Sequence, residues 1–182
     1  MNRLSLPVLL SFILLMVMAC CPVSALTADE WYDNGLALSK QERYDEALDA
    51  FNQGLKVDPD DRYLWYWKGA TLSDLERYDE ALDVFNQELK VHPEDRDLWY
   101  WKGATLSDLK RYDEALDAFN QGLKVDSKGT SGATLWGGKG LALFYLGRYE
   151  EAIAAFDIEL KLDPDNYNAL EFRDTILKIL ME

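Results

Sequence analysis

The chain has 182 residues, a formal net charge of −14 and a hydrophobic content of 48%. This length suits one domain, and the apolar content is enough to form a core, which excludes a globally disordered chain. The negative charge disfavours nucleic acid and anionic lipid as partners, whereas it favours a basic partner segment or bound cations, or simply keeps the surface soluble.

The first 25 residues differ from the rest of the chain. Arg3 is the only charged residue before Asp29, and the apolar run from Leu4 to Met18 is followed by the small residues Val23-Ser24-Ala25. A short charged start, an apolar stretch and small residues at the end are typical of a secretory signal peptide. We therefore expect segment 1–25 to direct export and to stand apart from the folded domain.

Two alternatives for this segment remain open. If it is not cut, the uncharged sequence up to Ala28 is long enough to span a bilayer and would act as a membrane anchor. Val17-Met18-Ala19-Cys20 also resembles a lipoprotein cleavage box. In all three cases residues 26–182 are expected outside the cytoplasm, secreted or anchored on the extracytoplasmic side of the membrane. Cleavage after Ala25 would remove Cys20 and Cys21 and leave no thiol for a disulfide or a metal site.

The remainder of the chain is an internal repeat. The string RYDEALD occurs at 43–49, 77–83 and 111–117, with a period of 34 residues, and RYEEAIA follows at 148–154. A longer string, LWYWKGATLSDL, occurs identically at 64–75 and 98–109. Four units can be aligned on these matches, followed by a shorter segment. Their bounds are 28–61, 62–95, 96–129 and 133–166, and the last segment is 167–182.

Each unit predicts two helices. A Gly at the eighth position, an Ala at the twentieth and a Phe at the twenty-fourth recur in all four units, as in Gly35, Ala47 and Phe51. Apolar residues between them are spaced by three and four, which is typical of helices that bury one face. The break between the helices is expected near Gln41-Glu42-Arg43. We expect Asp45, with its equivalents Asp79 and Asp113, to be the N-cap of the second helix.

These fixed positions resemble the W-x2-L-G-x2-Y…A-x3-F…P pattern of the tetratricopeptide repeat family. The resemblance covers residues 28–166 and implies an all-α, right-handed solenoid of four helix-turn-helix repeats. Segment 167–182, with Leu170, Ile176, Leu177 and Leu180, would form a C-terminal capping helix. Small residues at Gly35 and Ala47 would allow close helix approach, because a lone helix pair cannot bury its apolar stripe without neighbours.

The fourth unit departs from the others. Before it, the chain reads DSKGTSG at 126–132, which is typical of a flexible join. Gly137 and Gly138 then replace the aromatic pair Tyr-Trp of the two preceding units, and each glycine weakens a helix by up to about 1 kcal/mol relative to alanine. The pair indicates either a degenerate terminal unit or a hinge or notch that a ligand backbone can approach.

The resemblance also implies a binding surface, because the first helices of such repeats line a concave groove. The implied partner-binding residues are Tyr32, Leu36, Tyr63, Tyr66, Ala70, Ser73, Asp74, Tyr100, Ala104, Ser107, Asp108, Phe144 and Tyr145. We expect Tyr32, Tyr66 and Tyr100 to form a ladder edged by the two aspartates, since tyrosine is a common hot-spot residue at interfaces. The tyrosines could instead pack on their neighbours and remain partly solvated.

Family members that hold acidic chaperone tails use a clamp of Lys, Asn and Arg. The corresponding positions here include Tyr32, Leu36, Asp97 and Trp101, so this clamp is absent and an acidic tail would be repelled. His92 is the only histidine, and we expect no catalytic residue, metal or cofactor. The sequence therefore predicts a non-enzymatic module that binds a protein or peptide with a basic or aromatic segment. A self-assembling homo-oligomer of the cell envelope is the alternative.

Overall fold

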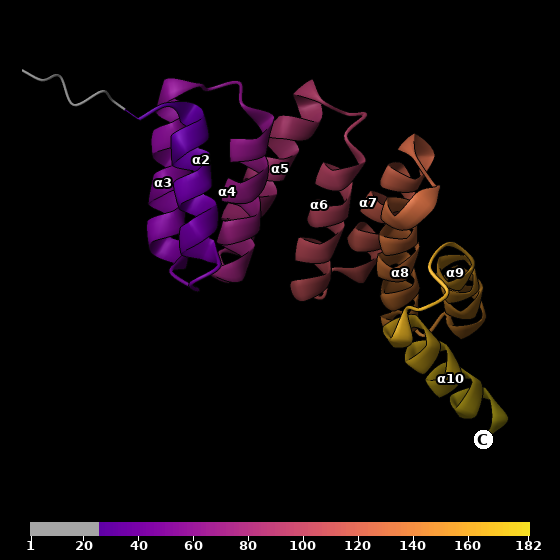
Figure 1. Ribbon diagram of the computed structural model, residues 1–182. Helices are drawn as coiled ribbons and strands as arrows, with labels where there is room; N and C mark the ends of the chain where they lie inside the picture. The colour runs from indigo at the N-terminus through magenta and orange to yellow at the C-terminus, as the bar shows by residue number, and fades with distance from the viewer. Residues whose placement is uncertain (1–25) are drawn as a thin grey trace, which may run out of the picture.

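The computed structural model describes residues 26–182, and within this range it contains α-helices and no strand (Figure 1). The helices pack as adjacent pairs, which confirms the all-α solenoid predicted from the repeat. Their bounds are α2 (Ala28–Ser39), α3 (Tyr44–Val57), α4 (Arg62–Asp74), α5 (Tyr78–Val91), α6 (Arg96–Asp108), α7 (Tyr112–Val125), α8 (Gly129–Tyr145), α9 (Tyr149–Leu162) and α10 (Tyr167–Met181). The predictions for segment 1–25 lie outside the described residues. No helix within 26–182 is long and apolar enough to cross a membrane.

Side-chain caps start the first helix of three units. Thr27 forms a capping box with Glu30 at α2, and Asp61 and Asp95 each accept hydrogen bonds from two backbone N–H groups at the starts of α4 and α6. These oxygens satisfy N–H groups that have no partner inside the helix. The first helices of the first three units therefore begin where the local sequence offers a capping oxygen.

The predicted cap of the second helices was wrong by two residues. α3 begins at Tyr44, so Asp45 lies inside the first turn, and the residue with non-helical backbone is Arg43, whose side chain makes no capping hydrogen bond. Arg43 instead donates to Glu46 at 2.7 and 2.6 Å, and this pair recurs in every unit. Asp45 still favours the helix, because negative charge in the first turn complements the helix dipole. The break itself falls at 41–43, as predicted.

In each unit, a phenylalanine of the second helix packs against a glycine of the first helix. Phe119 is 2% exposed, and a Cβ atom at Gly103 would lie 2.6 Å from its Cε1 atom. The same contact joins Gly140 to Phe156, where the distance would be 2.8 Å. The alanine at the twentieth position is fully buried in all four units, for example Ala115. The repeated small residues therefore permit close packing within each pair, as the repeat indicated.

The expected flexible join at 126–132 was too long. Helix α8 already begins at Gly129, so three residues separate it from α7. Gly132 is buried, and a Cβ atom there would lie 2.5 Å from the backbone of Ser127, which shows how closely the added residues turn back on the chain. The extra residues of the fourth unit lengthen its first helix.

Helix α10 packs on α9 and covers the end of the stack through contacts that extend from Ala169 to Ile176. Ile176 is fully buried, and the ring of Phe172 stacks on Phe156 with centroids 5.9 Å apart. Leu177 and Leu180, which the sequence placed on the apolar side, are 41% and 45% exposed, because the helix extends past its neighbour (Figure 1). The contacts that cover the end of the stack thus end at Ile176.

Candidate functional site

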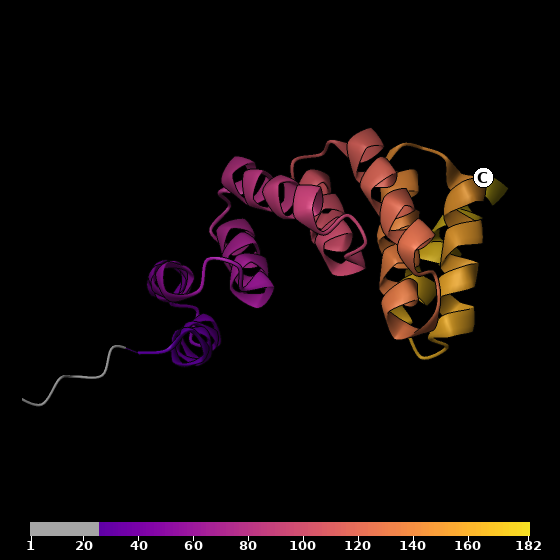
Figure 2. The ribbon, with the colours of Figure 1, turned by 90° about the horizontal axis from the view of Figure 1, so that it is seen from above.

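The first helices of successive units line one side of the molecule. α2 contacts α4, α4 contacts α6, and α6 contacts α8. Seen from above, the helix pairs follow a curved path, and these direct contacts place the first helices on its inner side (Figure 2). The residues that the sequence assigned to partner binding belong to these first helices.

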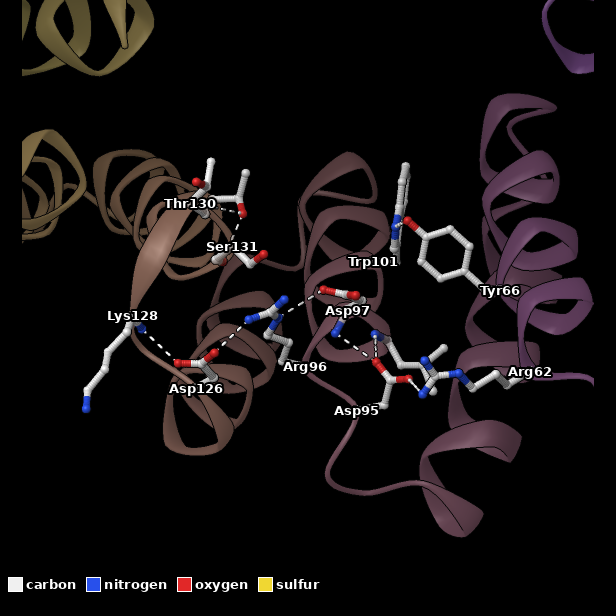
Figure 3. A network of polar contacts seen from close by, with 12 residues as sticks. Arg62, Tyr66, Asp95, Arg96, Asp97, Trp101, Asp126, Lys128, Thr130 and Ser131 are labelled. Carbon is white, nitrogen blue, oxygen red and sulfur yellow. Dashed lines mark hydrogen bonds and ion pairs between the residues drawn. The ribbon is translucent and has the colours of Figure 1, made fainter. Parts of the chain in front are cut away.

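The tyrosines of this face are joined through a tryptophan. The ring centroid of Trp101 lies 5.8 Å from that of Tyr66 and 5.7 Å from that of Tyr100, both edge to face. The indole N–H of Trp101 donates a hydrogen bond to the hydroxyl of Tyr66, one repeat away (Figure 3). We call Tyr66, Trp101 and Tyr100 the aromatic row. All three residues are half-buried, so each keeps part of its ring accessible.

The expected ladder of three tyrosines is interrupted at its first member. Tyr32 packs edge to face on Tyr63, with centroids 6.4 Å apart, and does not continue to Tyr66. Tyr63 is 56% exposed, whereas Ala70 is 2% exposed and offers little surface to a partner. Leu36 packs against the buried cluster formed by Ala47, Phe51, Leu55 and Leu64. The predicted groove residues thus range from open surface to core.

One pair of hydroxyl groups connects α4 to α6, and other hydroxyls bond within α6. The Ser73 and Thr105 hydroxyl oxygens lie 2.9 Å apart, and Thr105 also donates to the carbonyl of Trp101 at 2.8 Å. The Ser107 hydroxyl donates to the carbonyl of Gly103 at 2.9 Å. Because these hydroxyls are already bonded within the chain, they contribute to helix packing more than to free binding capacity.

Two carboxylates edge the inner face. Asp74 and Asp108 are both exposed, and neither forms an ion pair or a side-chain hydrogen bond within residues 26–182. Partial removal from water raises the pKa of each carboxyl group. These two exposed carboxyl groups give this edge an acidic character.

A separate ion network lies near the N-termini of α4 and α6 (Figure 3). Arg62 reaches Asp95 at 3.5 Å, and Arg96 contacts Asp126 at 2.7 Å and Asp97 at 3.3 Å. Arg62 of α4 thereby contacts the N-cap residue of α6, and Arg96 of α6 contacts the C-cap residue of α7. These pairs are partly solvated, so they hold neighbouring units together only weakly.

The inner face deepens into a pocket of about 610 Å³ that is lined by residues of α6, α7, α8, α9 and α10. Five of the predicted groove residues line it: Tyr100, Ala104, Ser107, Asp108 and Tyr145. Sequence reasoning missed the residues that close its far side, namely Glu159, Asn166, Asn168 and Phe172. Phe144 packs on Phe172 with ring centroids 5.8 Å apart. The pocket therefore joins the last repeat to the capping helix.

The glycine pair of the fourth unit has a packing explanation. A Cβ atom at Gly138 would lie 2.5 Å from Cε1 of Phe119, and one at Gly137 would lie 2.5 Å from a carboxylate oxygen of Glu159. Both glycines thus make room for side chains of neighbouring helices. Gly137 also lines the pocket. It occupies the fifth position of its unit, where the other units have a tyrosine, and the carboxylate of Glu159 lies beside it instead.

No group of three His, Cys, Asp or Glu residues within 26–182 is arranged to hold a metal ion. His92 lies in the loop before α6, with its Nδ1 atom 3.6 Å from a carboxylate oxygen of Glu94. Glu159 is the described group whose pKa departs most from its ordinary value, and burial, aided by the charge of Asp163, raises it to about 7.

Comparison with protein-family models gives a match over most of the chain. Models described as tetratricopeptide repeat match residues 32–87, 71–131 and 133–166. No curated protein matches the chain.

Solved structures share the fold at low sequence identity. A tetratricopeptide repeat protein from Parabacteroides merdae is 20% identical with a TM-score of 0.74, over 90% of this chain and 62% of that one. YrrB, described as having an unusual peptide-binding site, is 22% identical with a TM-score of 0.64, over 85% and 78%. The first repeat domain of Spaghetti (RPAP3), bound to the HSP90 peptide SRMEEVD, is 24% identical with a TM-score of 0.62, over 65% and 92%. These likenesses show the fold alone.

Proposed function

The chain belongs to the tetratricopeptide repeat family, and from this premise we propose that it is a non-enzymatic scaffold that binds a protein or peptide on its inner face. The observation that carries the proposal is the aromatic row, in which Tyr66, Trp101 and Tyr100 are half-buried and keep some exposed surface across two repeats. Tyrosine and tryptophan supply large contact area at little entropic cost and dominate many interfaces.

The charges favour a partner with basic residues. Asp74 and Asp108 edge the inner face, and the chain carries a net charge of −14. The HSP90 peptide bound to the RPAP3 domain is acidic, and the positions Tyr32, Leu36 and Asp97 offer no cationic side chain to such a peptide. Electrostatic complementarity would speed encounter with a basic segment and disfavour an acidic one.

The test is capture of partners by the full chain and by a groove variant. Tyr66→Ala combined with Tyr100→Ala should abolish retention of bound protein, because it removes two of the three rings of the aromatic row. Tyr167→Ala is the matched control, since Tyr167 is 72% exposed at the start of α10 and away from the row. Circular dichroism establishes that each variant is folded. Equal capture by both variants would rule the inner face out.

We also propose that the domain works outside the cytoplasm. The support is the sequence of segment 1–25, with one charged residue and a long apolar run. Cell fractionation with intact-mass measurement tests this: a protein that begins near residue 26 in an exported fraction agrees, and an uncut protein in the cytoplasm does not. An uncut or lipid-modified chain in the membrane fraction would indicate the anchored form.

A second candidate function is structural self-assembly. The last turns of α10 expose Leu177, Ile179, Leu180 and Met181 to between 41% and 79%. A second copy could cover this apolar end, since a solenoid end is a natural stacking surface. Sedimentation at increasing concentration tests it, with Leu180→Glu as the disrupting variant. A monomer at the highest concentration reached would exclude this function.

A further inference from the structure

The pocket behind the aromatic row has a carboxylate in its wall. Glu159 of α9 is 5% exposed, although acidic residues are almost never this buried without a partner. Its Oε1 atom accepts a hydrogen bond from the Asn166 side-chain amide at 2.9 Å, and no residue within 26–182 forms an ion pair with it. The carboxylate is therefore held in place but its charge is not compensated.

The second carboxylate oxygen of Glu159, Oε2, lies against Gly137, where a Cβ atom would be 2.7 Å from it. No hydrogen bond to Oε2 exists within the described residues. Oε2 is nevertheless not among the fully buried side-chain atoms without a partner, since the hydroxyl of Ser39 is the one such atom within these residues. Oε2 therefore keeps a small accessible surface, and Glu159 is one of the residues that line the pocket. Oε2 is thus the oxygen of Glu159 whose hydrogen-bonding capacity is unused within residues 26–182, because Asn166 binds Oε1.

The groups around the pocket do not supply the missing cation. Lys110 lines the pocket but is exposed and makes no ion pair within residues 26–182, and Asp108 adds a second negative charge. Asp163, directly after α9, also raises the pKa of Glu159. The other titratable groups lining the pocket are Tyr100, Tyr112 and Tyr145. A cation entering the pocket would meet a net negative field.

The fourth unit alone combines the two residues that the pocket needs. The position of Glu159 is occupied by Gly54, Glu88 and Gly122 in the other units, and the position of Gly137 is a tyrosine in all three. The space beside Gly54 is filled by the side chain of Leu64, and the space beside Gly122 is filled by that of Leu135. A carboxylate and an open inner-face position thus coincide once in the repeat array.

We propose that this pocket receives the side chain of a lysine or arginine from the partner segment, with Oε2 of Glu159 as its counter-charge. The stacked rings of Tyr112 and Tyr145, 4.8 Å apart, and the ring of Phe172 border the same space and suit the aliphatic stem of such a side chain. A buried carboxylate gains most from a partner that brings both charge and hydrogen bonds. The proposal rests on the proposed function and specifies the chemistry of the partner.

The test uses the isotope-labelled full chain and three small probes followed by amide chemical shifts. The probes are N-acetyl-lysine methylamide, N-acetyl-arginine methylamide and, as the uncharged match, N-acetyl-norleucine methylamide. At least one basic probe should shift the Gly137 and Gly138 amides saturably, and norleucine should not. Glu159→Gln keeps the acceptor for Asn166 and should weaken binding at least tenfold. Glu88→Gln, at the same position of the second unit, should leave it unchanged.

Raising the pH from 5.5 to 8 should strengthen binding about tenfold or more, because Glu159, with a pKa of about 7, ionises across this range. Absence of a saturable shift, equal binding of norleucine, or undiminished binding to Glu159→Gln would overturn the proposal. If partner capture still depends on Tyr66 and Tyr100 in that case, the proposed function stands and the pocket assignment fails. If the probes bind as expected but no partner requires the aromatic row, the proposed function fails instead.

Discussion

The indole N–H of Trp101 in α6 donates to the hydroxyl of Tyr66 in α4, so one repeat is bonded to the next on the inner face. The equivalent tryptophan one unit earlier, Trp67, donates no side-chain hydrogen bond within residues 26–182. Tyr32 stands to Trp67 as Tyr66 stands to Trp101, but Tyr32 packs on Tyr63 of the second unit. The third unit has Asp97 at the position of Tyr63, so no tyrosine ring competes for Tyr66 there.

This difference predicts unequal effects of the same substitution. Trp101→Phe keeps an aromatic ring but removes the bond to Tyr66, so it should lower the free energy of unfolding by about 1 kcal/mol more than Trp67→Phe does. Urea unfolding of both variants measures the difference. In a Tyr66→Phe background the excess should disappear, and an excess that persists there would mean that the hydrogen bond is not its source.

A second prediction concerns the sign of a glycine substitution. In an exposed helix interior, Gly→Ala stabilises by about 1 kcal/mol. The Phe119 ring, however, fills the space beside both Gly103 and Gly138, so Gly138→Ala should destabilise the chain by about 1–3 kcal/mol. Thermal or urea unfolding gives the sign directly.

The control for Gly138→Ala is the same change in a Phe119→Leu background. The smaller side chain should leave room for the added methyl group, so the cost should shrink or reverse. Stabilisation by Gly138→Ala in the wild-type background would show that the fourth unit is loosely packed at this point.

A third prediction compares two arginines at the same repeat position. Arg96 contacts Asp126 at 2.7 Å and is 30% exposed, whereas Arg62 reaches Asp95 at 3.5 Å and is 52% exposed. Arg96→Ala should cost up to about 1 kcal/mol at low salt and Arg62→Ala less, because exposed pairs are screened and entropically costly. Unfolding at low and high salt measures both, and equal effects would contradict the geometric argument.

The repeat predicted contacts within a unit better than contacts between units. Gly35, Ala47 and Phe51 lie on one helix pair, so their fixed spacing was enough to predict close packing. The bond from Trp101 to Tyr66 depends on how successive pairs are rotated, which no spacing within one unit specifies. The cap of α3 was misplaced because both Arg43 and Asp45 stand near the break, and the backbone geometry selects the former.

The sequence likewise predicted part of the candidate site and missed the rest. The resemblance placed Tyr66 and Tyr100 on the inner face, but Ala70 turned out to be buried. Glu159 was missed because it belongs to a second helix, which the groove positions leave out. The signal that could have found it was the pairing of Gly137 with a glutamate 22 residues later, a combination absent from the other three units.

The last prediction is that Glu159 lowers stability above neutral pH. Burial, with the charge of Asp163, raises the pKa of Glu159 from 4.5 to about 7, so the folded state holds a proton that the unfolded state has lost between these values. Stability should therefore fall as pH rises from about 4.5 to 7 and level off above. Glu159→Gln removes this penalty and should be more stable than wild type by about 1–3 kcal/mol at pH 8, with no difference near pH 4.5. Urea unfolding at both pH values measures it, and Glu150→Gln, on the exposed side of α9, controls for net charge. A Glu159→Gln advantage that is independent of pH would contradict the raised pKa.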